Sequence, residues 1–545
     1  MPTGQVTGLA SGIDWQETIQ LMMQIESMPM VQLEDRKEVY ESKLEAWQSI
    51  NSKLLSLKST MQGMDEVDEV LVKSASSSDT DIATVSAEAG AISGSYSLEV
   101  NQLARAEKWT HDGWADENTT PVNSSGGDLV FAYNYDGTDY TVNVPDGTTL
   151  AELAQLINND IDNEEVTATM LNDGSGTGTA YHLVLTGASG ADNTITLAAN
   201  PPNTLSGFES GNWGGVPTQS AQNAQFRIDG YPSGSWIESE SNEVSDAITG
   251  LTIILKSTNI GSAIDLSVAN DYDAVKDKIQ AFVDAYNEAV GQIQLQTKYN
   301  AETEEASPLF GNGSAINIKS SIQSIIASTI PGLADGDIYR SLSEAGVELG
   351  NNGMLEIDDD KLQDALEEDF QEVGEIFAFS SSSTSNNLSF FYRTEQTQGG
   401  EYEVIANYDA GGNLTSATIN GHVASIEGDY IVGASGEAEA GMRIEFTNPG
   451  GGAGSVSATI TLKTGAAVQI NNYLDFVTDP IDGTVQIAED GIEDAIESLD
   501  RQIERWEERL VIKQQQLEAE FLNMELLINS LQTTGSYVSS VMSGL

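Results

Sequence analysis

The stretch DGIEDAIESLDRQIERWEERLVIKQQQLEAEFLNMELLINSLQ (490–532) decides the fold of this chain. Its apolar residues recur at steps of three or four, which is the spacing of one face of a long helix. Lys513 interrupts this apolar seam, and between Leu517 and Phe521 the seam shifts by four residues, a stutter that locally unwinds a supercoil. Because the other faces are polar, the helix needs a partner. The seam consists of Ile496, Leu499, Ile503, Trp506, Leu510, Leu517, Phe521, Met524, Ile528 and Leu531.

The N-terminal region offers a matching helix. Asp14 and Glu17 have the spacing of a capping box, so a helix begins there, and Pro29 is expected to interrupt it. From Leu33 onward a near-heptad apolar seam follows, in which Asn51 is interpreted as a polar residue that sets the register. The seam contains Tyr40, Leu44, Trp47, Asn51, Leu54, Leu57, Met61 and Met64. At 1.5 Å per residue, the N- and C-terminal helices would be about 45 and 65 Å long.

Charged side chains accompany both seams. Arg501, Arg505, Arg509 and Lys513 form a basic stripe at steps of four, and Glu34, Glu38, Glu41 and Glu45 form an acidic stripe. Complementary charges beside apolar seams are typical of paired helices, so we expect the two ends of the chain to pair with each other. Packing against neighbouring subunits is one alternative. The other is that both stripes are solvated faces held by local pairs such as Glu497 with Arg501.

The middle of the chain is predicted to be rich in β-strands. ISGSYSLEV (92–100) and LTIILK (251–256) show strand patterns, and Asn-, Gly- and Thr-rich turns lie between such runs. One short helix is expected at 150–160. Helices return at 273–297, 314–328 and 359–379, before a second strand-rich stretch from about 385 to 465.

The predicted fold class is therefore α+β multidomain, with paired terminal α-helical coiled coils, a helical and mixed body, and β-rich head modules. The predicted order is an N-terminal segment and long helix (1–68), the first part of the body (69–109), a variable β-rich module (110–220), a second β-rich module (221–270), the helical body (271–384), an inserted β-rich module (385–466), a return to the body (467–488) and a C-terminal coiled-coil helix (489–545).

Composition excludes several classes of function. The chain carries 84 acidic and 23 basic residues, a formal net charge of −61, which repels nucleic acid and disfavours an anionic membrane surface. No apolar run approaches the roughly 20 residues of a membrane-spanning helix. The absence of cysteine excludes disulfides and thiolate metal sites, and fits either a chain exported unfolded or plain drift in an acidic proteome.

No pattern for catalysis stands out. His111, His182 and His422 lie in separate contexts without metal-ligand spacing, and each is interpreted as a surface residue. GGAGSV (451–456) resembles a calcium-binding repeat, but Val456 occupies the position that needs Asp. Weak calcium binding by Asp/Asn/Gly turns is a minor alternative. We predict no enzyme activity, no cofactor and no metal.

Several stretches together resemble the bacterial flagellar filament-capping proteins, the hook-associated protein 2 family. The stretches are GLASGIDW (8–15), YESKLEAWQSINSKLLSLK (40–58), GSYSLEVNQLARAEKW (94–109), DYDAVKDKIQAFVDAYNEAV (271–290), SLSEAGVELGNNGMLEIDDDKLQDALEEDFQEVGEIF (341–377) and 490–532, in the order of the family. The segment 228–255 is similar to a module shared with flagellins. The segments 110–220 and 385–465 match no module that we can name.

The resemblance implies a structural cap at the distal end of the flagellum. Members of the family leave through the flagellar export channel without a cleaved signal peptide, form a ring-shaped homo-oligomer at the filament tip and help flagellin to fold and insert beneath it. The implied partners are the chain itself, flagellin, hook–filament junction proteins and a cytoplasmic export chaperone. The paired termini would be the legs, with contacts at Leu44, Trp47, Asn51, Leu54, Ile503, Trp506, Leu510, Phe521 and Met524 beside the charged stripe of Arg501, Arg505, Arg509 and Lys513.

Two alternatives remain. A secreted adhesin with a coiled-coil stalk would share the long helices, and cap proteins themselves can also adhere. Another flagellar axial protein would also pair its terminal helices. Long unpaired helices are marginal in water, so we expect the terminal helices to become ordered only on assembly.

Overall fold

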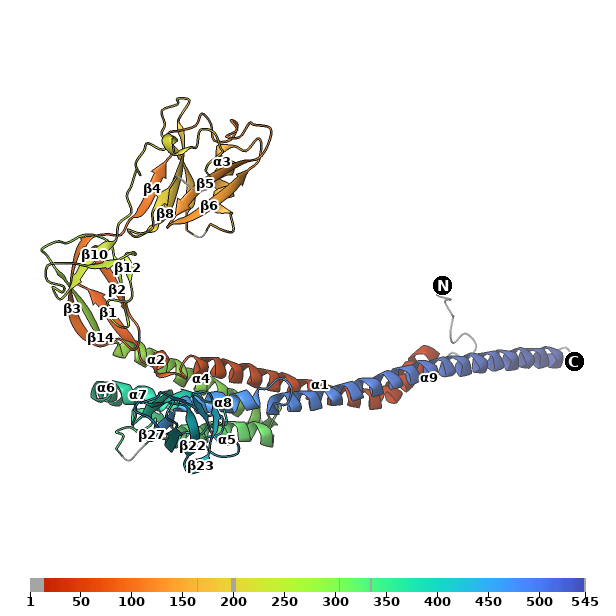
Figure 1. Cartoon of the computed structure of the whole chain (residues 1–545). Coiled ribbons are helices and arrows are strands. Elements are labelled where there is room, and N and C mark those ends of the chain that lie inside the picture. Colours follow the sequence, from red (N-terminus) through yellow and green to blue (C-terminus); the bar gives the residue numbers. More distant parts are fainter. Residues whose placement is uncertain (1–13, 164, 198–201, 303, 334–335, 544–545) are drawn as a thin grey trace. The chain divides into compact units, whose positions relative to one another are not determined.

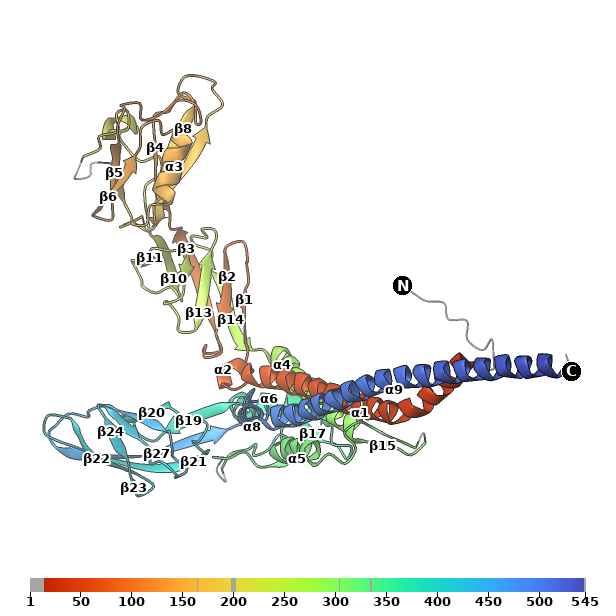
Figure 2. The same cartoon turned by 90° about the vertical axis from the view of Figure 1, so that its right-hand side faces the viewer.

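The computed structural model describes residues 14–163, 165–197, 202–302, 304–333 and 336–543. The chain divides into two compact units, residues 1–70 with 273–545, and residues 71–272. The first unit contains two long terminal helices, a helical body and an inserted β module, and the second contains two β-rich modules (Figures 1 and 2). The predicted α+β multidomain class is confirmed. Residues 1–13, at the start of the N-terminal segment (1–68) that the resemblance links to export, lie outside the described residues.

The terminal helices α1 (Trp15–Gln62) and α9 (Thr484–Ser543) lie side by side and run antiparallel. Trp15 contacts Phe521 in the C-terminal half of α9, whereas Lys37 pairs with Asp500 in its N-terminal half. As the capping spacing predicted, the Asp14 carboxylate accepts hydrogen bonds from the backbone N–H groups of the first turn. With 48 and 60 residues, the helices are about 72 and 90 Å long, longer than expected.

The expected interruption at Pro29 is wrong, because α1 continues through this residue. A proline inside a helix removes one backbone hydrogen bond and crowds the preceding turn, which disfavours the helix locally. In α1, the apolar seam continues on both sides of Pro29 against α9, and packing of such a face supplies most of a helix's stability in a protein. Tertiary packing therefore overrides the local preference.

The body consists mainly of helices. They are α2 (Val67–Val70), α4 (Tyr272–Thr297), α5 (Gly313–Ala327), α6 (Asp359–Glu368), α7 (Phe370–Phe377) and α8 (Ala466–Val477), with the hairpins β15 (Tyr299–Asn300)–β16 (Glu305–Ala306) and β17 (Val347–Leu349)–β18 (Leu355–Ile357). The predicted stripe of α4 is buried, including Phe282 and Tyr286. The single helix predicted at 359–379 is two helices, because Asp369 leaves the helical conformation and its side chain caps α7 by accepting the Glu372 N–H.

The inserted module begins at Phe379, a few residues before the predicted boundary, and is entirely antiparallel. Its strands are β19 (Phe379–Ser383), β20 (Leu388–Tyr392), β21 (Gly400–Tyr408), β22 (Leu414–Ile419), β23 (His422–Val423), β24 (Ser425–Glu427), β25 (Tyr430–Val432), β26 (Arg443–Phe446) and β27 (Gly454–Thr464). They form two sheets in the orders β19-β27-β21-β22-β23 and β20-β26-β25-β24. Alternating apolar residues of both sheets form one core, as strands with one buried face require.

The second unit contains two β modules, of which the one formed by its first and last strands is called the inner β module and the one inserted into it the outer β module. The inner β module comprises β1 (Lys73–Ser77), β2 (Ala83–Ala87), β3 (Gly94–Gln102), β10 (Ala224–Ile228), β11 (Ile237–Ser239), β12 (Glu243–Val244), β13 (Leu251–Leu255) and β14 (Ile264–Asn270). The sheets have the orders β1-β14-β3-β10-β11 and β12-β13-β2. The strands predicted at 92–100 and 251–256 are confirmed.

The outer β module is built between β3 and β10 and has its own core. It contains β4 (Ala106–Thr110), β5 (Leu129–Tyr135), β6 (Thr138–Val144), α3 (Leu150–Asn158), β7 (Thr167–Asn172), β8 (Tyr181–Ser189), β9 (Ile195–Thr196) and a 3₁₀ turn at Ser210–Asn212. The predicted short helix is α3. Large buried side chains such as Phe131, Phe208 and Trp213 fill the core of this module.

Candidate functional site: the antiparallel leg

The leg, which is the pair formed by α1 and α9, has a narrow apolar seam. Of the predicted α9 seam, Leu499 and Leu517 are buried and Ile503, Trp506, Leu510 and Phe521 are half-buried, whereas Leu531 is 69% exposed. Met524 is 40% exposed, and Glu525 takes the inward position beside it. A seam that is only half-buried along most of its length is held by few apolar contacts, and is weaker than a continuous hydrophobic core.

The C-terminal part of α1 leaves the leg and packs on the body. Lys53 pairs with Glu288 of α4 at 2.7 Å, and Lys58 pairs with Asp475 of α8 at 2.5 Å. The predicted contact residues Trp47 and Leu54 are fully buried in α1, together with Ile50, Leu57 and Met61, whereas Leu44 is half-buried. The body therefore anchors one end of the leg.

An aromatic contact joins the N-terminal end of α1 to α9. The indole ring of Trp15 stacks on Phe521 with a centroid distance of 4.6 Å, and its Nε1–H donates to the Glu525 carboxylate at 2.5 Å. Trp15 is only 8% exposed although it is the first residue of α1. Sequence analysis missed this contact. Its signal was an isolated Trp directly after a helix cap, at a position where a solvated helix end needs no aromatic residue.

The charged stripes do not face each other within the leg. Among the residues that the structure describes, the ion pairs that join the two helices are Lys37–Asp500 at 2.7 Å and Lys513–Glu26 at 4.0 Å. Arg501 pairs with Glu497 on its own helix, in the local arrangement that was the alternative to stripe pairing. Arg509 lies over the Trp506 ring at 4.3 Å. The bases that bind across the leg are therefore Lys37 and Lys513, and sequence analysis missed Lys37.

Asn51 occupies a half-buried place on α1, and its side-chain oxygen has no hydrogen-bond partner among the described residues. Glu489, near the start of α9, likewise has one buried carboxylate oxygen without such a partner. Burial and the neighbouring Glu493 and Asp490 raise the pKa of Glu489. Polar groups left in this state reduce the stability of the packing around them.

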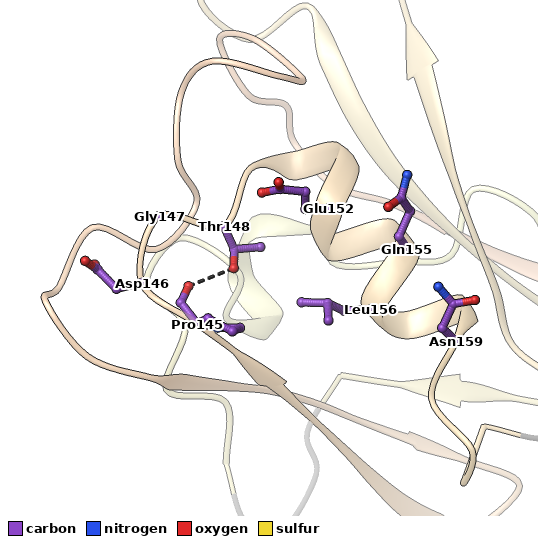
Figure 3. Close-up of a pocket in the computed structure, with 8 residues that line it drawn as sticks. All are labelled: Pro145, Asp146, Gly147, Thr148, Glu152, Gln155, Leu156 and Asn159. Carbon is purple, nitrogen blue, oxygen red and sulfur yellow. Dashed lines mark hydrogen bonds between the residues drawn. The ribbon is translucent and has the colours of Figure 1, made fainter.

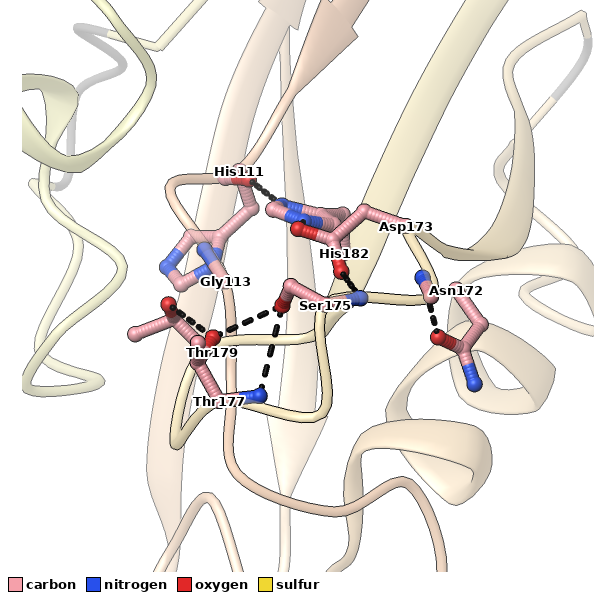
Figure 4. Close-up of polar contacts among 9 residues, drawn as sticks. His111, Gly113, Asn172, Asp173, Ser175, Thr177, Thr179 and His182 are labelled. Atoms are coloured by element: carbon pink, nitrogen blue, oxygen red, sulfur yellow. Dashed lines mark hydrogen bonds and ion pairs between the residues drawn. The ribbon is translucent and has the colours of Figure 1, made fainter.

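The histidines form no metal site. His111 is 2% exposed and stacks on Phe208, so its interpretation as a surface residue is wrong. Its Nε2 hydrogen-bonds to the Gly207 carbonyl at 2.7 Å, its Nδ1 accepts the Gly113 N–H, and burial lowers the pKa of His111. His182 bonds through Nδ1 to the His111 carbonyl and lies 3.4 Å from Asp173 (Figure 4). Within the described ranges, no three His, Cys, Asp or Glu side chains are placed to hold a metal ion.

A surface hollow beside α3 is lined by Pro145, Asp146, Gly147, Thr148, Glu152, Gln155, Leu156 and Asn159 (Figure 3). Its polar groups already serve the fold. The Thr148 hydroxyl donates to the Pro145 carbonyl at 2.7 Å, and the Glu152 carboxylate accepts the Thr149 N–H in a capping box. This hollow gives no indication of catalysis. No helix in the described part of the chain is long and apolar enough to cross a bilayer.

Comparison with known proteins connects both helices of the leg to one family. The model for the C-terminus of flagellar hook-associated protein 2 matches residues 221–533, and the model for its N-terminus matches 11–107. A flagellin hook IN motif matches 128–189, inside the segment for which the sequence suggested no counterpart, rather than at 228–255. Both segments alternate short strands with glycine turns, so the pattern alone could not separate them.

Individual relatives agree with these matches. The A-type flagellar hook-associated protein 2 of Pseudomonas aeruginosa is 31% identical over 393 residues, covering 68% of this chain and 80% of the relative. The flagellar hook-associated protein 2 of Escherichia coli K12 is 25% identical over 384 residues, covering 68% and 79%. Among solved structures, the D1-D2-D3 domains of the flagellar cap protein FliD of Escherichia coli align with a TM-score of 0.48 at 25% identity, covering 61% of this chain and 89% of that one.

Proposed function

The chain belongs to the flagellar hook-associated protein 2 family, and from this membership we propose how its antiparallel leg serves the filament cap. Its function is that of a flagellar filament cap, a structural role at the tip of the flagellum. The observation that carries this conclusion is the pair of family matches that includes α1 and most of α9. We place the protein outside the cell, exported through the flagellar pathway.

Several copies would form a ring, with the legs directed toward the filament and the β modules toward the medium. Exported flagellin would fold and insert beneath this ring, and the ring would prevent its loss. Junction proteins at the hook and an export chaperone in the cytoplasm are the further partners of this proposal. The support is the family membership together with the leg. The leg is formed by α1 and α9, which are the first and last helices among the described residues.

The composition of the leg suits contacts that are broken and made again. A cap that moves on as each flagellin enters must release its leg contacts at every step, so strong contacts would slow growth. The seam of this leg is half-buried, contains Lys513 opposite Glu26, and has buried polar oxygens on Asn51 and Glu489 without partners among the described residues. Replacing Lys513 with Leu should tighten the leg and slow filament growth. A tighter leg with unchanged growth would refute this mechanism.

Deletion of the gene tests the function itself. A cap mutant should lose its filaments and release flagellin into the medium, whereas loss of attachment with normal filaments would indicate the adhesin. Complementation with the full chain and with a chain carrying Trp15→Ala and Trp506→Ala separates the role of the leg from that of the β modules. Electron microscopy of purified particles should show rings for the full chain.

A further inference from the structure

The arginines of the basic stripe and Glu34 and Glu38 of the acidic stripe are exposed at the same level of the leg. The contacts Lys37–Asp500 and Glu26–Lys513 place α1 residues 26–37 alongside α9 residues 500–513. Arg501 and Arg505 lie within this stretch of α9, Glu34 lies within the matching stretch of α1, and Glu38 follows it directly. All four side chains belong to exposed residues. The two sets of side chains are therefore opposite in charge and lie at the same level along the axis of the leg.

These charged side chains form few ion pairs within the described part of the chain. Among the described residues, neither Arg505 nor Arg509 forms an ion pair with any carboxylate, and neither Glu34 nor Glu38 forms one with any base. Arg501 pairs only with Glu497 one turn away. A chain with 23 bases among 545 residues places three of them in one exposed row on its C-terminal helix.

Exposed apolar side chains accompany each stripe. Val31 and Val39 of α1 are 45% and 54% exposed, and Val511 and Ile512 of α9 are both 55% exposed. None of these belongs to the seam that joins α1 to α9. An apolar row flanked by charges of one sign, facing a second row flanked by the opposite sign, is the arrangement of a paired helix interface.

We propose that Arg501, Arg505 and Arg509 of one leg bind Glu34 and Glu38 on the leg of the next copy in the cap. The proposal rests on the function proposed above, because it requires several parallel legs. Legs that point the same way bring α9 of one copy antiparallel to α1 of the next, which is the orientation already found within each leg. Because the two surfaces differ, the contact is heterologous and can repeat from copy to copy, which builds a ring when the rotation between copies closes.

The first experiment uses the absence of cysteine from the chain. One full-length chain carries Glu34→Cys and a second carries Arg505→Cys, and a short thiol-specific crosslinker is added to the mixed, assembled caps. We expect a covalent product of twice the chain mass. A chain carrying Glu26→Cys and Lys513→Cys is the control for an intrachain contact. If the single chain with both Glu34→Cys and Arg505→Cys links only to itself, the proposal is overturned.

The second experiment is charge reversal followed by mixing. A chain with Arg501→Glu, Arg505→Glu and Arg509→Glu, and a chain with Glu34→Lys and Glu38→Lys, should each need about tenfold higher concentration to assemble. Mixing the two should restore assembly, since each supplies the stripe that the other lacks. If the stripes instead paired within one chain, only a chain that carries both sets of reversals would regain assembly.

The matched control is Glu507→Lys with Glu508→Lys, two exposed residues next to the basic stripe. It changes the net charge as much as the reversal of Glu34 and Glu38, and it should not weaken assembly. If wild-type chains form caps and all these variants assemble equally well, the inference fails while the cap function stands. If wild-type chains form no caps at all, the proposed function fails first.

Discussion

A single aromatic residue holds the first turn of α1 against α9. Trp15 joins the first turn of α1 to Phe521 and Glu525 of α9. Trp15→Ala removes this stacking and the hydrogen bond, and should destabilise the tip of the leg by about 3 kcal/mol. Trp15→Phe keeps the ring and should cost less. Amide hydrogen exchange of the first turns of α1 measures both, and equal protection in the alanine variant would contradict the prediction.

His422 makes the inserted module sensitive to pH. Its Nδ1 lies 2.7 Å from the buried Glu439 carboxylate, and its Nε2 lies 3.7 Å from Glu437. The hydrogen bond to Glu439 raises the pKa of His422 above its ordinary value of 6.5, so the contribution to stability is complete below pH 6.5. It is lost as the pH rises through the raised pKa of the folded state.

We therefore expect hydrogen exchange of β22–β26, corrected for its intrinsic pH dependence, to show stronger protection at pH 6 than at pH 8. His422→Gln should abolish the difference without unfolding the outer β module, whose histidines are in other surroundings. A difference that persists in His422→Gln would assign it to another group.

At the scale of elements, packing allows α1 to contain a proline. Pro29 lacks a backbone donor inside a helix of 48 residues. Pro29→Ala should stabilise this part of α1 by about 1–3 kcal/mol. The upper value is the full difference in helix propensity between proline and alanine, and the lower value is that of an exposed position where the helix has partly adapted. Hydrogen exchange of the residues just after position 29 measures the gain. Val31→Ala, at an exposed neighbouring position, is the control, and no gain over it would show that α1 has already adapted to the proline.

The terminal part of α9 differs from the rest of the leg. All residues from Ser530 to Ser543 are exposed, and residues 526–545 contain no charged side chain in a chain in which 20% of residues are charged. Because residues 484–521 pack against α1 within one chain, the expectation that the terminal helices become ordered only on assembly is narrowed to this end of α9. Limited proteolysis of a verified monomer should therefore shorten α9 from this end before it attacks residues 484–521. Assembly should protect the end. Early cleavage inside 484–521 would contradict this order.

At the scale of the whole molecule, charge opposes association. Each copy carries a net charge of −61, so like-charged β modules repel when copies approach. Salt at 0.15 M screens charges farther apart than about 8 Å. Ring formation should therefore strengthen from low to moderate salt, as measured by native mass or sedimentation. A ring that is most stable at the lowest ionic strength would show that ion pairs between legs outweigh the repulsion.

The sequence by itself determined the periodic parts of this protein. The seam from Leu499 to Phe521, the start of α1 at Asp14 and the buried face of α4 all follow from local spacing, because an amphipathic helix repeats its pattern every turn. The same reasoning predicted the α+β class and the alternation of helical and β-rich segments. The quoted stretches, in their order along the chain, predicted the family that the comparisons confirm.

Only the tertiary structure decided which side chains meet. Lys37 binds Asp500, Trp15 binds Glu525 and His111 is buried under Phe208, and each contact joins positions distant in the sequence. Spacing shows that a residue lies on a helix face, but the rotation of that face toward its partner depends on the packing of both helices. For this reason the stripe of Arg501, Arg505 and Arg509 was readable from the sequence, while its orientation away from the acidic stripe of its own chain was not.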